Sequence, residues 1–373
     1  IHLLGTNSVP RELQNMKESQ LERGANQALF FNTLAFTICF GAWMLNGVLV
    51  TFLVDNQLFS WGPVEIGWLL GIPVLTGAIF RLPAGILTDK FGGRPMFTLL
   101  LLFSAIPMFL LSQVNGFLGF ALCSFGFGLT GAGFAIGIAF TSVWYPIKWQ
   151  GTALGIFGAG NAGAAITTLF APTLLEKLTD DGMNLEGWRI LPMIYAGALV
   201  ITAIIFFLGT KNRKPASSNK NIRKLLEPLK SVRVWRFGLY YFLVFGCFVA
   251  FSQWLVPYFV NVYYMPLVTA GILASLFSFP SGVIRALGGW MSDKWGGRKV
   301  FYWVLASSVV ICFLLIIPRM DIYSPGKGIM AKKSGKVTSV TKDQIVVDEM
   351  VYRLQARESI LDDADSRELI FPP

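Results

Sequence analysis

The sequence predicts an all-α polytopic membrane protein made of two related halves. Of its 373 residues, 54% are hydrophobic and only 14% are charged, and the mean hydropathy is +0.58. Apolar runs of about 18 or more residues recur, which is the length that a helix needs to cross a bilayer. A stretch that begins at Arg81 returns 204 residues later at Arg285. A repeat at this distance indicates two halves of similar build.

The apolar runs predict nine spans, six before a polar segment and three after it. In order they cover residues 29–54, 63–88, 96–114, 116–145, 151–174, 188–209, 236–262, 267–292 and 299–318. We therefore expect a six-helix bundle over 29–209, a basic linker over 210–235 and the first three helices of a second bundle over 236–318. Because the repeat predicts two six-helix halves, we expect the sequence to be a fragment that lacks the last three helices.

The two ends of the chain are polar. Residues 1–28 form a tail before the first span, and residues 319–373 form a hydrophilic segment after the last one. Between residues 332 and 350 apolar and polar residues alternate, which is typical of strands. A small β-hairpin is expected there.

Lysine and arginine gather on one side of the predicted spans. If the N-terminus lies inside the cell, the inner segments hold most of them, including the cluster from Lys211 to Arg236, whereas three outer loops hold none. The positive-inside rule therefore predicts a cytoplasmic N-terminal tail, a cytoplasmic linker and an external segment 319–373. The net charge of +10 follows from this topology. We expect the linker to face anionic lipid headgroups, and we do not expect a nucleic-acid partner.

An arginine within apolar sequence opens each copy of the repeat. Arg81 and Arg285 each lie eight residues before an aspartate, about 12 Å back along a helix, and charges within a membrane usually face a cavity or a partner. Snorkelling toward the interface is one alternative. An internal salt bridge is another, but carboxylates lie only at or beyond the ends of the spans. The expected partner is a small anion from solution, since an arginine fork donates two parallel hydrogen bonds to an oxyanion.

The fifth predicted span is rich in glycine around one amide. Residues 155–163 hold four glycines, Gly158 among them, and Asn161. Close helix packing through small residues accounts for the glycines equally well. It does not account for Asn161, whose amide needs a partner in hydrocarbon. Ordinary core packing stays an equal alternative for three aromatic residues considered for the same pocket: Phe134, Tyr241 and Phe245.

Both copies of the repeat resemble the cytoplasmic loop signature of the major facilitator superfamily, which occurs once in each half. The pattern is Gly-x-x-x-Asp-Lys-x-Gly-Gly-Arg, and its residues here, expected to act as conformational-switch loops, are Gly85, Asp89, Arg94, Gly289, Asp293 and Arg298. The resemblance implies two six-helix bundles. It also implies that the aspartate caps a helix, or pairs with the lysine or arginine of the signature, between adjacent helices in one of two alternating states.

The segment from Trp144 to Ile156, with the glycine-rich run that follows it, resembles the nitrate signature of the nitrate/nitrite porter family in that superfamily. That family grips nitrate between arginines of its second and eighth spans, which assigns this role to Arg81 and Arg285. The same resemblance implies further substrate-binding residues: Phe134, Gly158, Asn161, Tyr241 and Phe245. The family's second nitrate signature belongs to an eleventh span, which this sequence does not contain.

These features predict a nitrate and nitrite transporter that works by alternating access, with nitrate/nitrite exchange as the expected mode. Two fixed positive charges disfavour an empty closed site, and no His, Asp or Glu lies deep in a predicted span. Proton symport remains an alternative. Transport of another small anion, or an anion sensor that does not transport, also remains open.

Other function classes are not expected. The sequence shows no nucleophile–base pair, metal cluster or cofactor motif, and its one histidine, His2, precedes the first span. We therefore expect no enzyme activity, cofactor or metal, and a monomer in the cell (inner or plasma) membrane. All four cysteines lie in apolar runs and are expected to be small buried residues without disulfides: Cys39, Cys123, Cys247 and Cys312.

Overall fold

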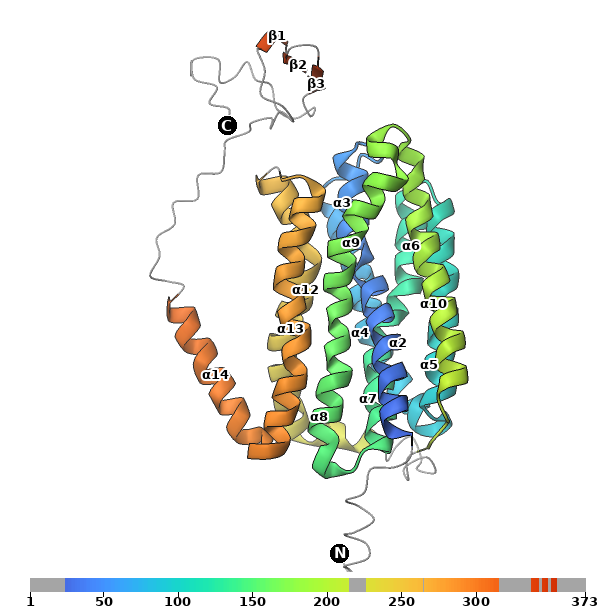
Figure 1. Ribbon diagram of the computed structural model, residues 1–373, viewed down its shortest axis with the longest axis vertical. Coiled ribbons are helices and arrows are strands. Elements are labelled where there is room, and N and C mark those ends of the chain that lie inside the picture. Colours follow the sequence, from blue (N-terminus) through green and yellow to red (C-terminus); the bar gives the residue numbers. More distant parts are fainter. Residues whose placement is uncertain are drawn as a thin grey trace, which may run out of the picture.

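The computed structural model shows a bundle of long helices that run side by side (Figure 1). It describes residues 24–214, 226–263 and 265–314, together with three short strands between residues 337 and 353. Within these residues, nine helical segments are long and apolar enough to cross a membrane. The predicted class, an all-α polytopic membrane protein with nine spans, is confirmed.

Six spans form the first half, and three of them are interrupted. α2 (Ala25–Trp43) continues as α3 (Leu45–Asp55), α6 (Phe117–Phe127) joins α7 (Gly133–Trp144) through the 3-10 turn η2 (Gly128–Ala132), and α8 (Ile147–Gly158) joins α9 (Gly163–Leu178) through η3 (Ala159–Ala162). The other three are α4 (Pro63–Phe91), α5 (Gly93–Leu110) and α10 (Ile190–Gly209). Tight 3-10 turns within a span let one helix present two differently oriented faces to its neighbours.

The second half repeats the helix lengths of the first. α13 (Leu267–Trp295) begins and ends 204 residues after α4, and α14 (Gly297–Leu314) begins 204 residues after α5. The glycines that follow the two long helices, Gly92 and Gly296, have φ values of 94° and 87°. Only glycine adopts this region without strain, and it commonly ends a helix. The shared turn gives a physical reason for the first glycine of each Gly-Gly pair.

Two element boundaries differ from the predicted ones. α12 (Val232–Tyr263), which opens the second half, begins inside the predicted linker 210–235, and the short turn η6 (Glu227–Lys230) precedes it. The fifth span begins at Ile147 rather than at residue 151, with Pro146 as its N-cap. Proline suits a helix start because it has no N–H to leave unsatisfied.

A buried amide compensates for a proline in α4. Pro73 has no N–H, so the carbonyl of Leu69, four residues earlier, loses its helical partner. Asn46 of α3 donates a hydrogen bond to this carbonyl at 2.7 Å, and another to the hydroxyl of Ser124 in α6 at 2.8 Å. Backbone polar groups in a bilayer must be satisfied within the protein. The amide therefore ties α3, α4 and α6 together.

The second half joins the first along α13, which packs against α8, η3 and α9. Glycines form this contact. A Cβ placed on Gly155 would lie 3.1 Å from the Cα of Gly289, and one placed on Gly282 would lie 2.7 Å from the backbone nitrogen of Ala162. Small residues allow the backbones of two membrane helices to approach closely, so the glycine-rich fifth span serves as a packing surface.

The burial predicted for the cysteines is wrong for two of them. Cys39 and Cys123 are buried, whereas Cys247 on α12 and Cys312 on α14 are exposed, and all four are free thiols. α14 buries only Val300 among its residues. An apolar span predicts that a residue lies in the membrane, but it does not say which face of the helix meets another helix.

The last described elements are three short antiparallel strands, in the order β1 (Val337–Thr341), β2 (Gln344–Val347) and β3 (Met350–Arg353). β1 and β2 form a hairpin within the segment whose alternation suggested one. β3 pairs with β2 and adds a strand that the alternation did not predict.

Candidate functional site

Arg81 and Arg285 share one aromatic ring. Arg81 lies on α4, Arg285 on α13 and Phe245 on α12. The guanidinium carbon of Arg81 is 4.9 Å from the centroid of the Phe245 ring, and that of Arg285 is 5.6 Å from it. The two guanidinium carbons are therefore no further apart than these two distances combined. The fold brings together the pair of arginines that the repeat pointed to.

Other helices of the first half hold Arg81. Its Nε donates a hydrogen bond to the carbonyl of Gly131 in η2 at 3.2 Å. Its guanidinium carbon lies 5.5 Å from the ring of Trp43 and 5.5 Å from the ring of Phe134. A cation within about 6 Å of a ring is attracted to the face of that ring. The described hydrogen bonds engage only Nε, which leaves the outer Nη1–Nη2 edge of the fork for another partner.

Arg285 has a more local anchor. Its Nε donates to the carbonyl of Ser281, one turn earlier on the same helix, at 3.3 Å. Its guanidinium carbon is 5.3 Å from the ring of Phe248. A Cβ placed on Gly158 of α8 would lie 3.3 Å from the Cδ of Arg285, so this glycine makes room for the arginine stem.

Three aromatic rings that the family resemblance assigns to the site form a stack beside the arginines. Phe134 lies 5.9 Å from Tyr241 and 5.7 Å from Phe245, and Tyr241 lies 4.9 Å from Phe245, with interplanar angles of 15–24°. Offset parallel rings at such distances attract one another. The stack joins α7 of the first half to α12 of the second.

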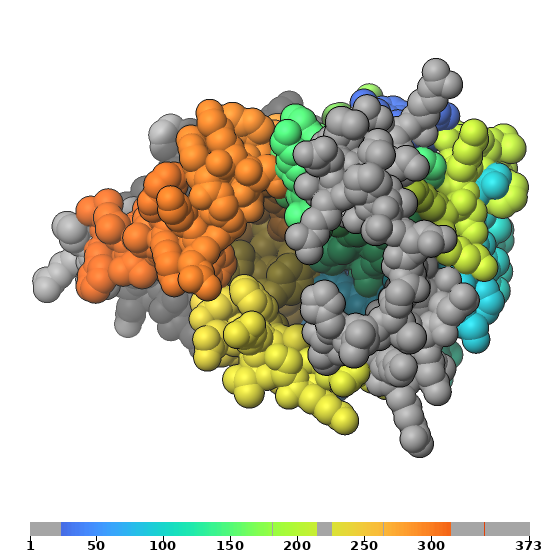
Figure 2. Space-filling model, turned by 90° about the horizontal axis from the view of Figure 1, so that it is seen from below, coloured from blue at the N-terminus to red at the C-terminus, as the bar shows by residue number. Residues whose placement is uncertain are grey.

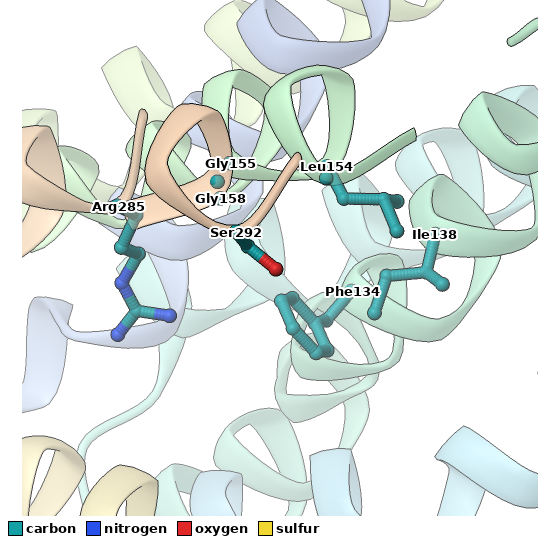
Figure 3. Close-up of a pocket in the computed structure, with 9 residues that line it drawn as sticks. Phe134, Ile138, Leu154, Gly155, Gly158, Arg285 and Ser292 are labelled. Carbon is teal, nitrogen blue, oxygen red and sulfur yellow. The ribbon is translucent and has the colours of Figure 1, made fainter. Parts of the chain in front are cut away.

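A cavity of about 320 Å³ lies beside Arg285, between α7, α8 and α13 (Figure 3). Arg285 and Ser292 are the polar side chains in a wall that is otherwise apolar or glycine, with Phe134, Ile138 and Leu154 on the side of the first half. Figure 2 shows a hollow between α12 and α13 on one side and helices of the first half on the other. The region around Arg285 can therefore hold a small polar solute.

Among the described residues, no acidic side chain forms a salt bridge with either arginine. One described ion pair, between Arg189 and Glu186, involves neither of them. Within the same residues, no cluster of His, Cys, Asp and Glu could hold a metal ion. The site is thus a locally uncompensated positive charge, and bare charges at membrane depth point to a function.

Asn161 is fully buried in η3, and within the described part of the chain neither its amide nitrogen nor its amide oxygen has a hydrogen-bond partner. Such an amide costs free energy unless a polar group binds it. Asn161 does not line the cavity beside Arg285. Gly158, one turn earlier in the chain, does line the cavity. The structure therefore places Asn161 near the site without a direct contact to either arginine.

The second copy of the loop signature joins the two halves. The carboxylate of Asp293, near the end of α13, accepts hydrogen bonds from the N–H of Gly151 at 2.9 Å, the N–H of Thr152 at 2.6 Å and the hydroxyl of Thr152 at 2.7 Å. Gly289, one turn earlier, packs directly against Gly151 and Gly155 of α8. Hydrogen bonds to a carboxylate are stronger than those between neutral groups. This contact, which we call the Asp293 joint, links α13 to α8.

The first copy contacts its own half. The Nε of Arg94 donates to the carbonyl of Phe207 in α10 at 2.9 Å, and its guanidinium carbon lies 4.0 Å from the ring of Phe207. A Cβ placed on Gly85 would meet no atom within 4 Å. Asp89 lies in the last turn of α4, and Arg298 is exposed at the start of α14. The two copies share their local turn but differ in what they contact.

Two residues at the site were not singled out from the sequence, namely Trp43 and Phe248. Each places a ring against one arginine, at 5.5 Å and 5.3 Å. The chain holds 32 Phe and 11 Trp, so an aromatic residue in a span carries little information. A usable signal for Trp43 would have been its place in the middle of the long first span, where the N–H of the indole needs a hydrogen-bond partner.

The comparisons with known proteins agree with this architecture. A family model described as Major Facilitator Superfamily matches residues 31–329. A protein named probable nitrate/nitrite antiporter NarK1 from Thermus thermophilus is 38% identical, over 83% of this chain and 70% of that protein. A nitrite extrusion protein from Bacillus subtilis is 28% identical, over 82% of this chain and 75% of that protein. A probable nitrate/nitrite transporter NarK2 from Mycobacterium tuberculosis is 30% identical, over 81% and 75%.

Solved structures show the same fold. A bacterial homolog of the human lysosomal transporter Spinster, in an inward-facing and occupied conformation, superposes with a TM-score of 0.56 at 21% identity, over 74% of this chain. The chain spans 63% of the length of that structure. The chain is a multi-pass membrane protein, and it belongs to the Major Facilitator Superfamily.

Proposed function

We propose that the protein is a secondary transporter, not an enzyme, that carries nitrate and nitrite across the membrane by alternating access. The observation that carries this proposal is the pair of arginines that share the Phe245 ring, 4.9 Å and 5.6 Å from it, with no acidic partner among the described residues. Two guanidinium groups from opposite halves that are held this close favour an anion as their common ligand.

The chemistry of the site suits a small planar oxyanion. Each guanidinium presents a flat fork that can donate two parallel hydrogen bonds to the oxygens of nitrate or nitrite. The rings of Phe134, Tyr241 and Phe245 give the site flat walls that match a planar anion in shape, while the two guanidinium groups supply the attraction. The Asn161 amide, buried without a partner in the described structure, can serve as a further donor when a movement of η3 brings it to the anion. The names of the similar proteins support the same substrates.

Exchange is the mode that the charges favour. Two cations in a low-dielectric site repel each other, so the empty transporter resists closing around them, and a bound anion removes this repulsion. The described membrane interior shows no paired Asp, Glu or His near the arginines that could carry a proton. Nitrate entering on one side would therefore be followed by nitrite leaving.

The moving parts follow from the two halves. We propose a cytoplasmic N-terminus in the cell (inner or plasma) membrane, with the Asp293 joint and the Arg94 contact on the cytoplasmic side, and a monomer as the working unit. The bundle 29–209 and the helices of 236–318 rock against each other around the arginine pair. The Asp293 joint breaks or forms in this motion, which makes the loop signature the switch, while residues 210–235 connect the halves.

Uptake into proteoliposomes tests this proposal. Labelled nitrate is offered to vesicles loaded with nitrite, nitrate or neither, with and without a pH gradient. We expect uptake only into vesicles that contain nitrite or nitrate, and no effect of the pH gradient. Arg233→Lys, at an exposed position in the first turn of α12, serves as the matched control for arginine substitutions. Uptake into empty vesicles driven by protons would replace exchange by symport, and no uptake under any condition would reject nitrate transport.

A further inference from the structure

Trp43 is a buried tryptophan at the point where the first span breaks. It is the last residue of α2, and Met44 separates it from α3. Its side chain is 1% exposed. Most buried tryptophans only fill a core. The contacts of the Trp43 ring and of its N–H distinguish this residue from such a core tryptophan.

Backbone on two sides fixes the indole. Its Nε1 donates a hydrogen bond to the carbonyl of Pro73 in α4 at 2.7 Å. Glycines form its seat: a Cβ placed on Gly77 would lie 2.9 Å from the ring, and one placed on Gly131 would lie 2.5 Å from it. Side chains at these two positions would displace the indole. The ring therefore has one orientation, set by α4 and η2.

The same backbone also holds Arg81. The carbonyl of Gly131 accepts the hydrogen bond from Arg81 Nε at 3.2 Å, while the Cα of Gly131 borders the Trp43 ring. The guanidinium carbon lies 5.5 Å from that ring, within the range of a cation–π contact. The indole and the arginine are thus two parts of one assembly, with η2 between them.

We infer that Trp43 is a positioning residue for anion binding: the locked indole supports the Arg81 guanidinium so that its Nη1–Nη2 edge faces the substrate. This inference rests on the proposed function. Without the indole, Arg81 keeps its charge and its bond to Gly131 but gains freedom to turn about that bond. An anion that needs two parallel hydrogen bonds then binds more weakly.

A plain packing role makes a different prediction, and the chain offers a matched control. Trp188 is also fully buried in the first half. It packs against Phe59 and Phe120 and shows no contact with Arg81 or Arg285 among the described residues. Loss of either indole should lower thermal stability, since both leave a cavity. Only loss of the Trp43 indole should change the way the arginine meets an anion.

The test measures nitrate binding to the purified protein by titration calorimetry, alongside its melting temperature. We expect Trp43→Leu to weaken nitrate binding by about 5- to 30-fold and Trp43→Phe, which keeps a ring face, to lie between it and wild type. Trp188→Leu should bind nitrate like wild type although its melting temperature falls. Equal nitrate affinity in Trp43→Leu, Trp188→Leu and wild type would overturn the inference.

A second measurement covers the case in which Trp43→Leu does not fold. Tryptophan carrying one, two or three fluorines, inserted at position 43 alone, keeps the shape and the N–H but withdraws electron density from the ring face. We expect nitrate affinity to fall stepwise with fluorine number, and a flat series would overturn the inference. A wild-type protein that binds no nitrate would reject the proposed function instead, so the two failures are distinguishable.

Discussion

Arg81 and Arg285 occupy equivalent positions in the two halves, 204 residues apart, yet they are held in different ways. Arg81 bonds across to Gly131 of η2 and contacts three rings, of Trp43, Phe134 and Phe245. Arg285 bonds to Ser281 of its own helix and contacts two rings. Arg81 has a hydrogen bond to another helical element of its half, whereas the hydrogen bond of Arg285 stays within its own helix and only the rings of α12 contact it from outside.

The position of Arg285 depends on the packing of the helix that carries it. Because Arg285 is anchored within α13, its place relative to Arg81 depends on how α13 sits against α8. Close glycine contacts and the Asp293 joint set that packing. A site of this kind can open when one helix shifts, while Arg81 stays fixed in its bundle.

The largest effect is expected when the guanidinium group of either arginine is replaced by an ammonium group. Arg81→Lys and Arg285→Lys keep the charge but lose the parallel donors, so nitrate uptake into proteoliposomes should fall at least about 100-fold in both. Because the two arginines are anchored differently, the two variants should differ in stability. Only Arg81→Lys leaves a cross-helix carbonyl, that of Gly131, without its donor, at a cost of about 1 kcal/mol. Normal uptake in either variant would remove the central hypothesis, and equal melting temperatures would remove the distinction between the anchors.

Next in size is the packing of α13 on α8. In Gly289→Ala the new Cβ would collide with the backbone of Gly151, so we expect a loss of about 1–3 kcal/mol in stability and a marked loss of uptake. Gly288→Ala is the matched control, since a Cβ there meets no atom within 4 Å. Thermal unfolding and uptake should separate the two variants. If they behave alike, close glycine packing does not position Arg285.

A smaller effect is expected at the Asp293 joint. Asp293→Asn removes the charge from three hydrogen bonds, and Thr152→Val removes one donor. Their combination should show a coupling of about 1–2 kcal/mol in a double-mutant cycle on thermal stability. Uptake should slow by several-fold rather than vanish, because the arginine pair is intact. Additive effects would show that the joint does not stabilise this state.

The smallest effect is expected at Phe134. Phe134→Ala removes one of the three rings around Arg81 and one face of the aromatic stack, and we expect nitrate to bind about 3- to 10-fold more weakly. Phe97→Ala, at a fully buried position whose ring meets Phe206 rather than an arginine, should lower stability without changing affinity. Titration calorimetry on both variants decides this. Unchanged affinity in Phe134→Ala would make Phe134 an ordinary core residue.

Much of the fold could be predicted because its signals are local. Span length follows from apolar runs, and the ends of α4 and α13 follow from a glycine that alone tolerates a positive φ. α12 begins at Val232, a few residues before the expected start of that span. The burial predicted for Cys247 and Cys312 was wrong. An apolar run does not mark the residue at which its helix begins. Nor does it show which face of the helix packs against another helix, so the exposure of a cysteine depends on the neighbouring helices.

The candidate site was predictable only in part. Arg81 and Arg285 stood out because a charge inside an apolar run is rare and costly, and the family resemblance supplied the aromatic residues. Phe248 could not be found, because one phenylalanine among 32 carries no mark of its neighbours. Trp43 offered only its N–H in mid-span as a signal, and that signal does not say which residue the ring contacts. Asn161 stood out because an amide in an apolar span needs a partner. The described structure shows it buried without one, and its substrate-binding role stays a prediction.

Hydropathy, repeats and charge are properties of the chain, so the membrane class, the two related halves and the two arginines in apolar spans could be inferred before the fold was known. Three contacts became visible only in the folded protein: both arginines lie against Phe245, the second loop signature bonds to α8 through Asp293, and the Trp43 ring lies 5.5 Å from the guanidinium carbon of Arg81. These contacts join residues on different helices. Helix packing sets these contacts, and it depends on glycines and interrupted spans that are far apart in the sequence.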